Sequence, residues 1–286
     1  MPDVNGVIAQ MFIYPVKSCG GVSVEHAQLV ATGLAHDRDW MIVDQDGLFL
    51  TQRQVPHLCW ITPQIGTDTL CLDAPGVGSV HVPLTADGPR RSVRVWRDTV
   101  EAIDMGPESG QWLDEYLQIP GKHFRLVRFS PQGVRTSDLA WTDGVAYPNH
   151  FSDGFALNVL SHQALVELNE RLAEQGHDPV DILRFRPNLV VEGIDAHEED
   201  ALATISIKTA AAHVDIEMVK PCPRCPIPNI DPHTAMSSPE VGKTLASYRA
   251  LPRMDSAVCF GMNGVVKSGM GEVLHVGQAF DGHYRC

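Results

Sequence analysis

Cys222 and Cys225 lie close together in a proline-rich segment and are the residues best suited to bind a metal or attack a substrate. The segment 219–232 holds five prolines, which exclude a helix and disfavour a central strand. We therefore expect both thiols on a stiff loop that follows a strand. Arg224 lies between the cysteines and Lys220 precedes them. Nearby positive charge lowers the pKa of a thiol and favours the thiolate, the form that binds soft metals.

The residues alone leave four interpretations of this cysteine pair. A zinc site needs more ligands, and the sequence has neither a second Cys-x-x-Cys nor a His-x-x-x-His. A thioredoxin-like redox pair normally opens a helix, which Pro226 and Pro228 disfavour. Two buried thiols in a turn are a purely structural alternative. The fourth interpretation, which we favour, is one thiolate on a metal whose other ligands come from a cofactor.

Two further segments combine positive charge with groups that suit an anion. The segment 14–21 ends a predicted strand with Lys17, Ser18 and two glycines, so that backbone N–H groups can approach an anion. In Arg184-Phe-Arg-Pro-Asn188, strand periodicity predicts both arginines and the asparagine on one face, where they form an anion receptor. The alternatives are a turn with a solvated lysine and surface arginines beside a strand.

The elements that must position these residues are short and mostly β. Glycine and proline separate β-like runs that predict a sheet or barrel built from hairpins, at 6–14, 22–29, 39–43, 48–51, 60–62, 69–72, 93–95 and 99–103. Asp44-Gln-Asp-Gly47 is a candidate hairpin turn. Later strand-like runs are at 188–191, 204–207, 213–218, 257–262, 264–266 and 274–276. The predicted fold class is β-rich α+β.

Few helices are predicted. Ser109 is expected to cap a short helix, and Ser161 caps the clearest helix, which Gly176 ends. A third helix begins at Ser238-Pro239-Glu240. Residues 129–155 are loop-like and form either a boundary or a long functional loop. The tryptophans at 96, 112 and 141 are expected in the core, although the last of them is also placed to line a pocket entrance.

The charge of the chain excludes some classes of partner. Asp and Glu outnumber Lys and Arg by 35 to 22, which leaves a net charge of −13 among 286 residues. Such a surface repels phosphate backbones and anionic lipid, so we expect no nucleic acid and no membrane as partner. The N-terminus does not resemble a signal peptide, and no apolar run approaches the ~18 residues of a membrane span. A cytoplasmic location is expected.

Together these segments resemble the MOSC family, named for the C-terminal domain of molybdenum-cofactor sulfurase, and specifically its members with an N-terminal MOSC β-barrel domain. Among these, the chain is similar to bacterial counterparts of the mitochondrial amidoxime-reducing component. The resemblance covers nearly the whole chain and is carried by Ile13-Tyr-Pro-Val-Lys-Ser-Cys-Gly-Gly21, His36-Asp-Arg-Asp-Trp40, Phe49-Leu-Thr-Gln-Arg53, Leu160-Ser161, Arg184-Phe-Arg-Pro-Asn188, Cys222-Pro-Arg-Cys225 and Asp231-Pro232. It implies an N-terminal β-barrel-like or sheet domain at 1–125 and a MOSC β-barrel domain at 126–286.

The resemblance also implies a molybdenum cofactor, Mo-molybdopterin, with a cysteine thiolate on the metal. Cys225 matches the metal ligand and is thereby the implied catalytic residue, with Cys222 as its neighbour. The positions that match cofactor-binding residues of the family are Lys17, Ser18, Arg38, Ser161, Arg186, Asn188 and Cys225. Asp231 is expected either to orient the cysteine loop or to cap a turn.

The implied function is molybdenum-dependent reduction of small N-hydroxylated compounds, namely hydroxylamines, N-hydroxylated bases and amidoximes, by removal of the oxygen atom at molybdenum. The cysteine spacing of a plant-type ferredoxin domain is absent, so electrons are expected from a separate iron–sulfur or flavin protein. Relatives with this activity often carry two threonines where Pro228 and Asn229 stand here, which leaves the polarity of the substrate pocket open. The alternatives are a persulfide carrier, a protein that handles molybdopterin without reductase activity, and a non-catalytic interaction domain.

Overall fold

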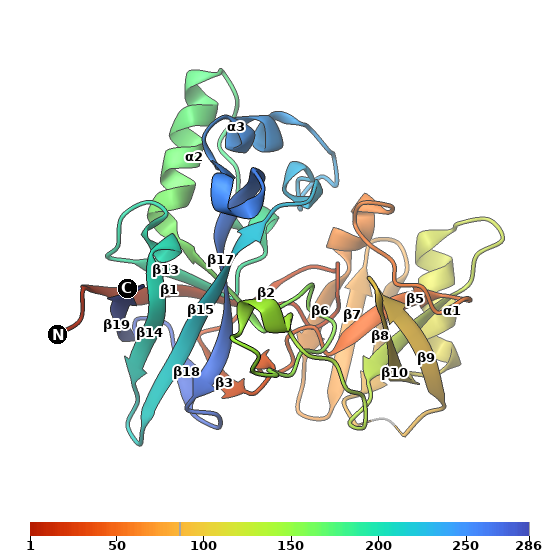
Figure 1. Cartoon of the computed structure of the whole chain (residues 1–286). Helices are drawn as coiled ribbons and strands as arrows, with labels where there is room; N and C mark the ends of the chain where they lie inside the picture. The colour runs from red at the N-terminus through yellow and green to blue at the C-terminus, as the bar shows by residue number, and fades with distance from the viewer. Residues whose placement is uncertain (86, 286) are drawn as a thin grey trace.

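The largest sheet closes on itself to form a barrel. The computed structural model describes residues 1–85 and 87–285. The strands of the barrel are β1 (Val4–Ile13), β12 (Leu157–Ser161), β13 (Leu189–Glu192), β14 (Leu202–Lys208), β15 (His213–Pro223), β17 (Ala257–Ser268) and β19 (Ala279–Tyr284). They follow one another in the order β12-β13-β1-β19-β14-β15-β17, and β12 also pairs with β17, which closes the ring (Figure 1). The predicted β-rich fold with a closed β-barrel is therefore confirmed.

Alternating side chains fill the barrel. In β15, buried Val214, Ile216 and Met218 alternate with less buried neighbours, as expected when successive side chains point to opposite faces. The same core takes residues from both ends of the chain, among them Ile8, Met11, Leu189, Ile205, Met262 and Phe280. Because β1 lies between β13 and β19, the barrel includes a strand from the first part of the sequence. The predicted domain boundary between residues 125 and 126 stays a prediction.

A second region lies beside the barrel and has its own core. Its four-stranded sheet has the order β5-β11-β10-β9 and its three-stranded sheet the order β6-β7-β8. These strands are β5 (Trp40–Asp44), β6 (Thr62–Ile65), β7 (Thr69–Ala74), β8 (Gly78–Pro83), β9 (Arg90–Val95), β10 (Asp98–Asp104) and β11 (Phe124–Phe129). Helix α1 (Pro107–Leu117) packs on this region at the right of Figure 1, where Trp112 and Leu113 enter the core. Gly47, with φ +76°, ends the predicted hairpin turn after β5.

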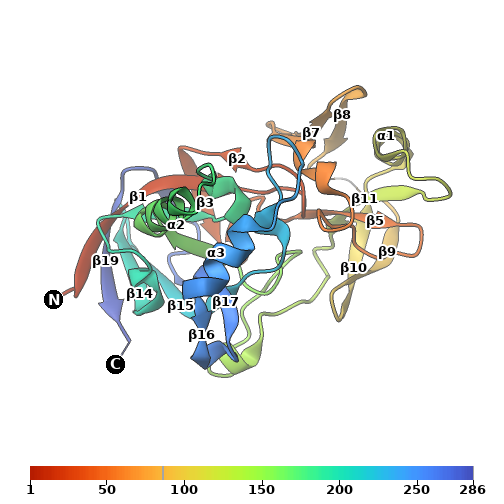
Figure 2. The same ribbon diagram turned by 90° about the horizontal axis from the view of Figure 1, so that it is seen from above.

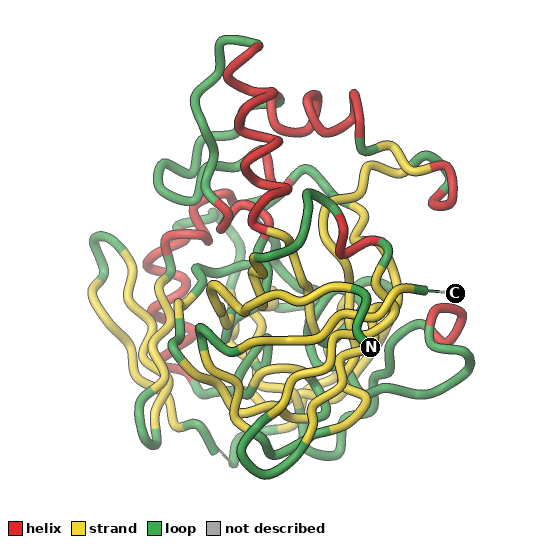
Figure 3. Tube along the Cα trace, turned by 90° about the vertical axis from the view of Figure 1, so that its left-hand side faces the viewer, coloured by secondary structure: helices red, strands yellow, loops and turns green. Residues whose placement is uncertain are grey.

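Two helices cover one end of the barrel, as Figures 2 and 3 show. They are α2 (His162–Glu174) and α3 (Glu240–Tyr248). The hydroxyl oxygen of Ser161 accepts a hydrogen bond from the Ala164 N–H at 3.3 Å, which confirms the predicted cap of α2, and Gly176 follows the helix with φ +77°. The predicted cap of α1 is wrong. Pro107 opens that helix, since proline needs no N–H acceptor there, and Ser109 lies inside the first turn.

The remaining strands are short and lie at the edges of these two regions. They are β2 (Val22–Ser23), β3 (His26–Val30), β4 (Gly33–Leu34), β16 (Ala250–Leu251) and β18 (Val273–His275). The long loop predicted at 129–155 is found at residues 130–156, between β11 and β12, and holds the single-turn helix η2 (Leu139–Trp141). The Arg135 side chain fixes this loop by donating to the backbone carbonyls of His150 and Ser152 at 2.7 and 2.6 Å. Among the described residues, no helix is both long and apolar enough to cross a membrane.

Candidate functional site

Segments far apart in the sequence meet in one pocket between the barrel and the second region. The pocket takes residues from the end of β1, from the turn before β13 and from the end of β15. Its polar lining includes Lys17, Ser18, Arg38, Asn158, Arg184, Arg186, Asn188, Cys222, Arg224 and Cys225. All of the cofactor positions predicted from the sequence, with the exception of Ser161, line this pocket. With Arg53, six cationic side chains therefore surround one cavity in a protein whose net charge is −13.

The two cysteines lie on different structural elements, one on a strand and one on a loop. Strand β15 extends to Pro223, so Cys222 is on the strand and only Cys225 is on the loop, which corrects the prediction that the loop carries both. Burial raises the pKa of the Cys222 thiol, and Arg224 only partly opposes this effect. The expectation that basic neighbours favour a thiolate is therefore wrong at Cys222. Cys225 is partly accessible at the pocket wall.

Arg224 anchors the cysteine loop to the barrel. Its Nε donates to the carbonyl oxygen of Phe260 at 2.8 Å and its Nη1 to that of Phe185 at 2.8 Å. Its Nη2 also donates to Oδ1 of Asn158 at 3.2 Å. A planar guanidinium can satisfy several acceptors at once in fixed geometry, which a lysine cannot do. The main role of Arg224 is thus to fix the position of Cys225.

Asp231 fills both of the roles expected from the sequence. Its Oδ1 accepts the N–H of His233 at 2.7 Å, which caps the turn after the cysteine loop. Its Oδ2 accepts a hydrogen bond from Nη2 of Arg184 at 3.0 Å. The loop is in this way tied to the turn that carries Arg184, and the charge of that arginine is already compensated.

The segment 184–188 reaches the pocket as a turn. Residues Ile182–Phe185 form a single-turn 3-10 helix, η3, and Arg186 follows with φ +53° in the left-handed region. The predicted strand face is therefore wrong. Asp181 caps this turn by accepting the N–H of Leu183 at 2.7 Å, and the reversal directs both arginines into the pocket. The two side chains arrive together through turn geometry, although the sequence spacing suggested strand alternation.

Arg186 carries the clearest sign of a missing partner. Its Nη1 donates to the carbonyl oxygen of Cys19 at 2.6 Å, whereas its Nη2 is buried and has no hydrogen-bond partner among the described residues. Burial and the nearby Arg38 charge lower the pKa of Arg186. A buried, unsatisfied guanidinium nitrogen is costly, and an anion in the pocket would remove that cost.

Arg38 lies beside Arg186 in a network of hydrogen bonds. Its Nη1 donates to both carboxylate oxygens of buried Asp37, at 2.6 and 2.5 Å, and to Oδ1 of Asn188 at 3.2 Å. The guanidinium groups of Arg38 and Arg186 lie 4.3 and 4.2 Å from the ring centre of Tyr14. Asn188 also donates to the carbonyl oxygen of Phe12 at 3.2 Å. The structure thus brings Arg38, Arg186 and Asn188 together, and Asp37 and Tyr14 are the parts of this arrangement that sequence reasoning missed; binding of an anion stays a prediction.

Lys17 and Ser18 lie in the turn that follows β1, as the sequence predicted. The buried Lys17 ammonium donates to the carbonyl oxygen of Phe151 at 2.7 Å and to Oδ1 of Asp153 at 2.5 Å, and burial lowers its pKa. Ser18 takes φ +67°, and its carbonyl oxygen accepts a hydrogen bond from Gln52 at 2.8 Å. Asp153 therefore compensates much of the charge that Lys17 was predicted to offer an anion.

Ser161 is not brought into the pocket. It is fully buried at the start of α2, where its hydroxyl donates to the carbonyl oxygen of Asp195 at 3.1 Å. Its N–H donates to Oε1 of Glu199 at 3.2 Å. Its role as a cofactor contact stays a prediction from the resemblance. In the part of the chain that the structure describes, no group of three or more His, Cys, Asp and Glu side chains is placed to hold a metal ion.

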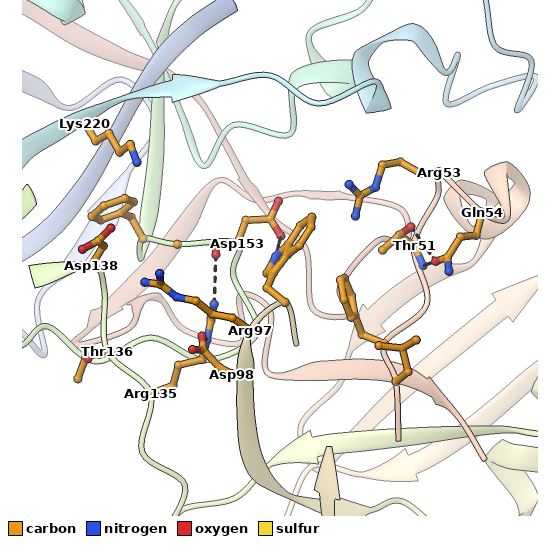
Figure 4. Close-up of a pocket in the computed structure, with 15 residues that line it drawn as sticks. Thr51, Arg53, Gln54, Arg97, Asp98, Arg135, Thr136, Asp138, Asp153 and Lys220 are labelled. Atoms are coloured by element: carbon orange, nitrogen blue, oxygen red, sulfur yellow. Dashed lines mark hydrogen bonds and ion pairs between the residues drawn. The ribbon is translucent and has the colours of Figure 1, made fainter. Parts of the chain in front are cut away.

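A wider cleft of about 800 Å³ opens beside this pocket (Figure 4). The two cavities share Thr51, Arg53, Trp96, Asp153 and Phe155 in their walls, so they are continuous. Trp96 is 40% exposed, which corrects the prediction that it belongs to the core, whereas Trp112 is buried as predicted. In Figure 4, Lys220 lies at one end of the cleft and Arg53 at the other.

Comparisons with known proteins agree with this architecture. The MOSC N-terminal beta barrel domain matches residues 5–120, and the MOSC domain matches residues 146–280. "Mitochondrial amidoxime reducing component 2" of Bos taurus is 34% identical over 85% of this chain and 72% of its own length. "Mitochondrial amidoxime-reducing component 1" of Mus musculus is 33% identical over 88% of this chain and 74% of its own length. "Molybdenum cofactor sulfurase" of Drosophila melanogaster is 32% identical over 84% of this chain, which spans 29% of that protein.

Proposed function

Because the chain belongs to the MOSC family, with an N-terminal MOSC β-barrel domain and a MOSC domain, we propose that it binds the molybdenum cofactor and reduces N-hydroxylated compounds. Two kinds of relative support this proposal through their names, which refer to amidoxime reduction and to the molybdenum cofactor. The substrates are small hydroxylamines, N-hydroxylated bases or amidoximes.

The observation that carries the proposal is the unsatisfied, buried Nη2 of Arg186 in a pocket that also holds Cys225. Molybdopterin carries a phosphate, and a phosphate accepts hydrogen bonds from guanidinium groups in planar, charge-assisted geometry. Arg186 and Arg38 would hold that phosphate, with Asn188 as a neighbouring amide. The residues present therefore fit an anionic cofactor.

Cys225 would be the protein's ligand to the metal. Both cysteines are half-buried, but burial raises the pKa of the Cys222 thiol, and Cys225 is the one on the loop that Arg224 anchors. A soft thiolate is a suitable ligand for molybdenum, and Arg224 fixes the loop that presents it. When bound, the cofactor supplies the two-electron chemistry by which an N–OH group becomes N–H and water.

The proposal includes a separate electron donor, either an iron–sulfur or a flavin protein. The N–O bond takes two electrons and two protons as it breaks, and each turnover must regain these electrons from a reductant other than the substrate. The reductase therefore needs an external donor that delivers electrons to the pocket. Titanium(III) citrate can replace the natural donor in a first assay, so the reaction can be tested before the donor is identified.

The alternative function is sulfur transfer through a persulfide on Cys225. It is favoured by the sulfurase relative and by the presence of a second thiol three residues before Cys225. A persulfide carrier needs an accessible nucleophilic thiol. Release of thiocyanate on treatment with cyanide, without reduction of N-hydroxylated compounds, would identify this alternative.

The test uses protein produced in a molybdenum-replete host, with metal measured by mass spectrometry, oxidised pterin by fluorescence, and benzamidoxime reduction under titanium(III) citrate. We expect close to one molybdenum and one pterin per chain. Cys225→Ser is expected to lose the metal and the activity, and Cys71→Ser, on β7 of the second region, is the matched control. Wild-type protein without metal and pterin would refute the proposal, as would full turnover by Cys225→Ser.

A further inference from the structure

The cleft in Figure 4 has an excess of unpaired positive charge. Its walls hold four cationic and three acidic side chains, namely Arg53, Arg97, Arg135, Lys220, Asp98, Asp138 and Asp153. Two of the acids are already paired: Asp98 with Arg135 at 2.8 Å, and Asp153 with Lys17 at 2.5 Å. Three cations and one carboxylate are left to face a ligand.

The three remaining cations have no carboxylate within 4.0 Å among residues 1–85 and 87–285. Arg53 stacks on the ring of Trp96 at 4.5 Å, and Lys220 lies over the ring of Trp141 at 4.8 Å. Arg97 is exposed at the turn between β9 and β10. Asp138 is engaged locally, since its Oδ1 accepts the N–H of Ala140 at 3.2 Å. The cleft is therefore an electropositive region on an acidic protein, and it favours an anion.

Trp96 gives the same cleft an aromatic wall. It occupies the first position of the two-residue turn between Val95 and Asp98, with φ +56°. Glycine and asparagine are favoured in such turns, and a bulky side chain in the left-handed region is strained. The indole N–H donates to Oδ1 of Asp153 at 3.0 Å, which holds the ring at the boundary between cleft and pocket. A strained residue held in this way at a cleft wall indicates a functional role.

We propose that this cleft selects aromatic or heteroaromatic N-hydroxylated substrates that carry an anionic group, a carboxylate or a phosphate. The ring of the substrate packs along the wall that Trp96 forms, and the anionic group contacts Arg97 and Lys220, whereas Arg53 stays stacked on Trp96 at the other end of the cleft. The N-hydroxylated end then points into the adjoining pocket, towards Cys225. This inference rests on the proposed function, because it assigns the substrate class of the same site.

Several cationic side chains of the pocket already have hydrogen-bond partners in the protein, whereas Arg53 and Arg97 of the cleft have none among the residues described. In the pocket, Arg184, Arg224 and Lys17 already donate to acceptors of the protein. In the cleft, Arg53 and Arg97 make no such hydrogen bond within the described chain, so their interaction with a ligand is not offset by the loss of an internal one. Salt screens charges that are exposed to solvent. The attraction between the cleft and an anionic ligand should therefore weaken as the salt concentration rises.

The experiment compares three amidoximes on the molybdenum-loaded protein: benzamidoxime, its 4-carboxylate and its 4-trimethylammonium derivative, with a 4-phosphonate as a fourth arm. We expect kcat/KM to be highest for the anions and lowest for the cation, mainly through KM. The carboxylate and phosphonate arms show which anionic group the cleft prefers. Raising the ionic strength should reduce the ratio of anionic to neutral kcat/KM.

The variants locate the effect in the cleft. Arg97→Gln is expected to lower the ratio of anionic to neutral kcat/KM about fivefold, the size of one exposed charge pair. Arg97→Lys should restore most of that ratio. The matched control is Arg94→Gln, an exposed arginine on the neighbouring strand β9 that does not line the cleft, and it should leave the ratio unchanged. An equal kcat/KM for neutral and anionic amidoximes would overturn the inference.

A binding measurement separates this inference from the proposed function. If the wild-type protein reduces none of the amidoximes, the proposed reaction fails, and the cleft is then tested with unreactive 4-carboxybenzamide. The cleft is supported as an anion site if this anion quenches tryptophan fluorescence and the neutral benzamide does not. The quenching by the anion should also be weaker in Arg97→Gln and in Trp96→Phe. The absence of any difference between the two amides would refute it.

Discussion

The side chain of Arg38 donates a hydrogen bond at 3.1 Å to the backbone carbonyl oxygen of Arg186, which lies 148 residues further along the chain. This contact holds two guanidinium groups against the ring of one tyrosine, Tyr14. Asp37 compensates the charge of Arg38, but Arg186 contacts no carboxylate within the described residues. The pair is therefore built around a negative charge that the protein does not itself supply.

Inorganic phosphate should stabilise the cofactor-free protein against heat. A ligand that binds only the folded state at 100 times its Kd adds about 2.7 kcal/mol, or several degrees in Tm for a chain of this size. The measurement is thermal unfolding in phosphate and in chloride at matched ionic strength. Arg186→Gln should abolish the phosphate effect. Arg171→Gln is the matched control, because Arg171 also stacks on a tyrosine, Tyr248, but lies on α2. An equal phosphate effect in both variants would contradict the assignment.

Ser161→Ala should lower stability and leave cofactor binding intact. The substitution removes the helix cap at Ala164 and a hydrogen bond to Asp195, so we expect a loss of about 1–2 kcal/mol in the free energy of unfolding. Chemical denaturation measures this loss, and metal analysis measures the molybdenum content. Ser109→Ala, inside the first turn of α1, provides the comparison. If the variant folds normally but loses molybdenum, Ser161 does contact the cofactor, as the family resemblance implied.

The buried Glu199 should make the protein less stable as the pH rises. Burial raises the pKa of Glu199 to about 8, whereas an unfolded glutamate titrates at its ordinary value of 4.5. Between these two values the folded state keeps a proton that the unfolded state has lost, so the free energy of unfolding falls with increasing pH. Below about 4.5 both states hold the proton, and above about 8 neither does.

Glu199→Gln should therefore flatten the pH dependence of Tm between pH 5 and 8, and the variant should gain most over wild type near pH 8. The amide oxygen can still accept the N–H of Ser161, so the local hydrogen bond is kept. Glu174→Gln, an exposed residue at the end of α2, is the control. Parallel curves of Tm against pH for wild type and Glu199→Gln would show that Glu199 is not protonated in the folded state.

The sequence predicted much of the pocket because short motifs carry its residues. Lys17, Arg38, Asn188 and Cys225 were each identified from a motif, and all of them line the pocket. The predicted caps and turns at Ser161, Gly176 and Gly47 were confirmed for a related reason, since capping depends on a few neighbouring residues. Site residues that belong to short motifs, and the caps and turns of single elements, can therefore be predicted from a few neighbouring residues.

Features that depend on distant contacts were not predicted. The alternation of polar and apolar residues at 184–186 predicts a strand, but the same short pattern also fits the 3-10 turn that the structure has there. Burial of Cys222, which raises its thiol pKa, comes from packing that its neighbours in the sequence do not reveal. Trp96 was assigned to the core by residue type, although a tryptophan followed by arginine in a two-residue hairpin turn was a signal of its exposure.

The pairing of β1 with β19 constrains the way in which this protein is made. Val4 lies opposite Gly282, so β1 must wait until β19 has been synthesised before it gains that neighbour. Contacts of such long sequence separation form late and leave strand edges exposed in the meantime. A nascent chain can thus complete its barrel only after β19 has left the ribosome, and a truncated product that lacks β19 has an open edge on both β1 and β14.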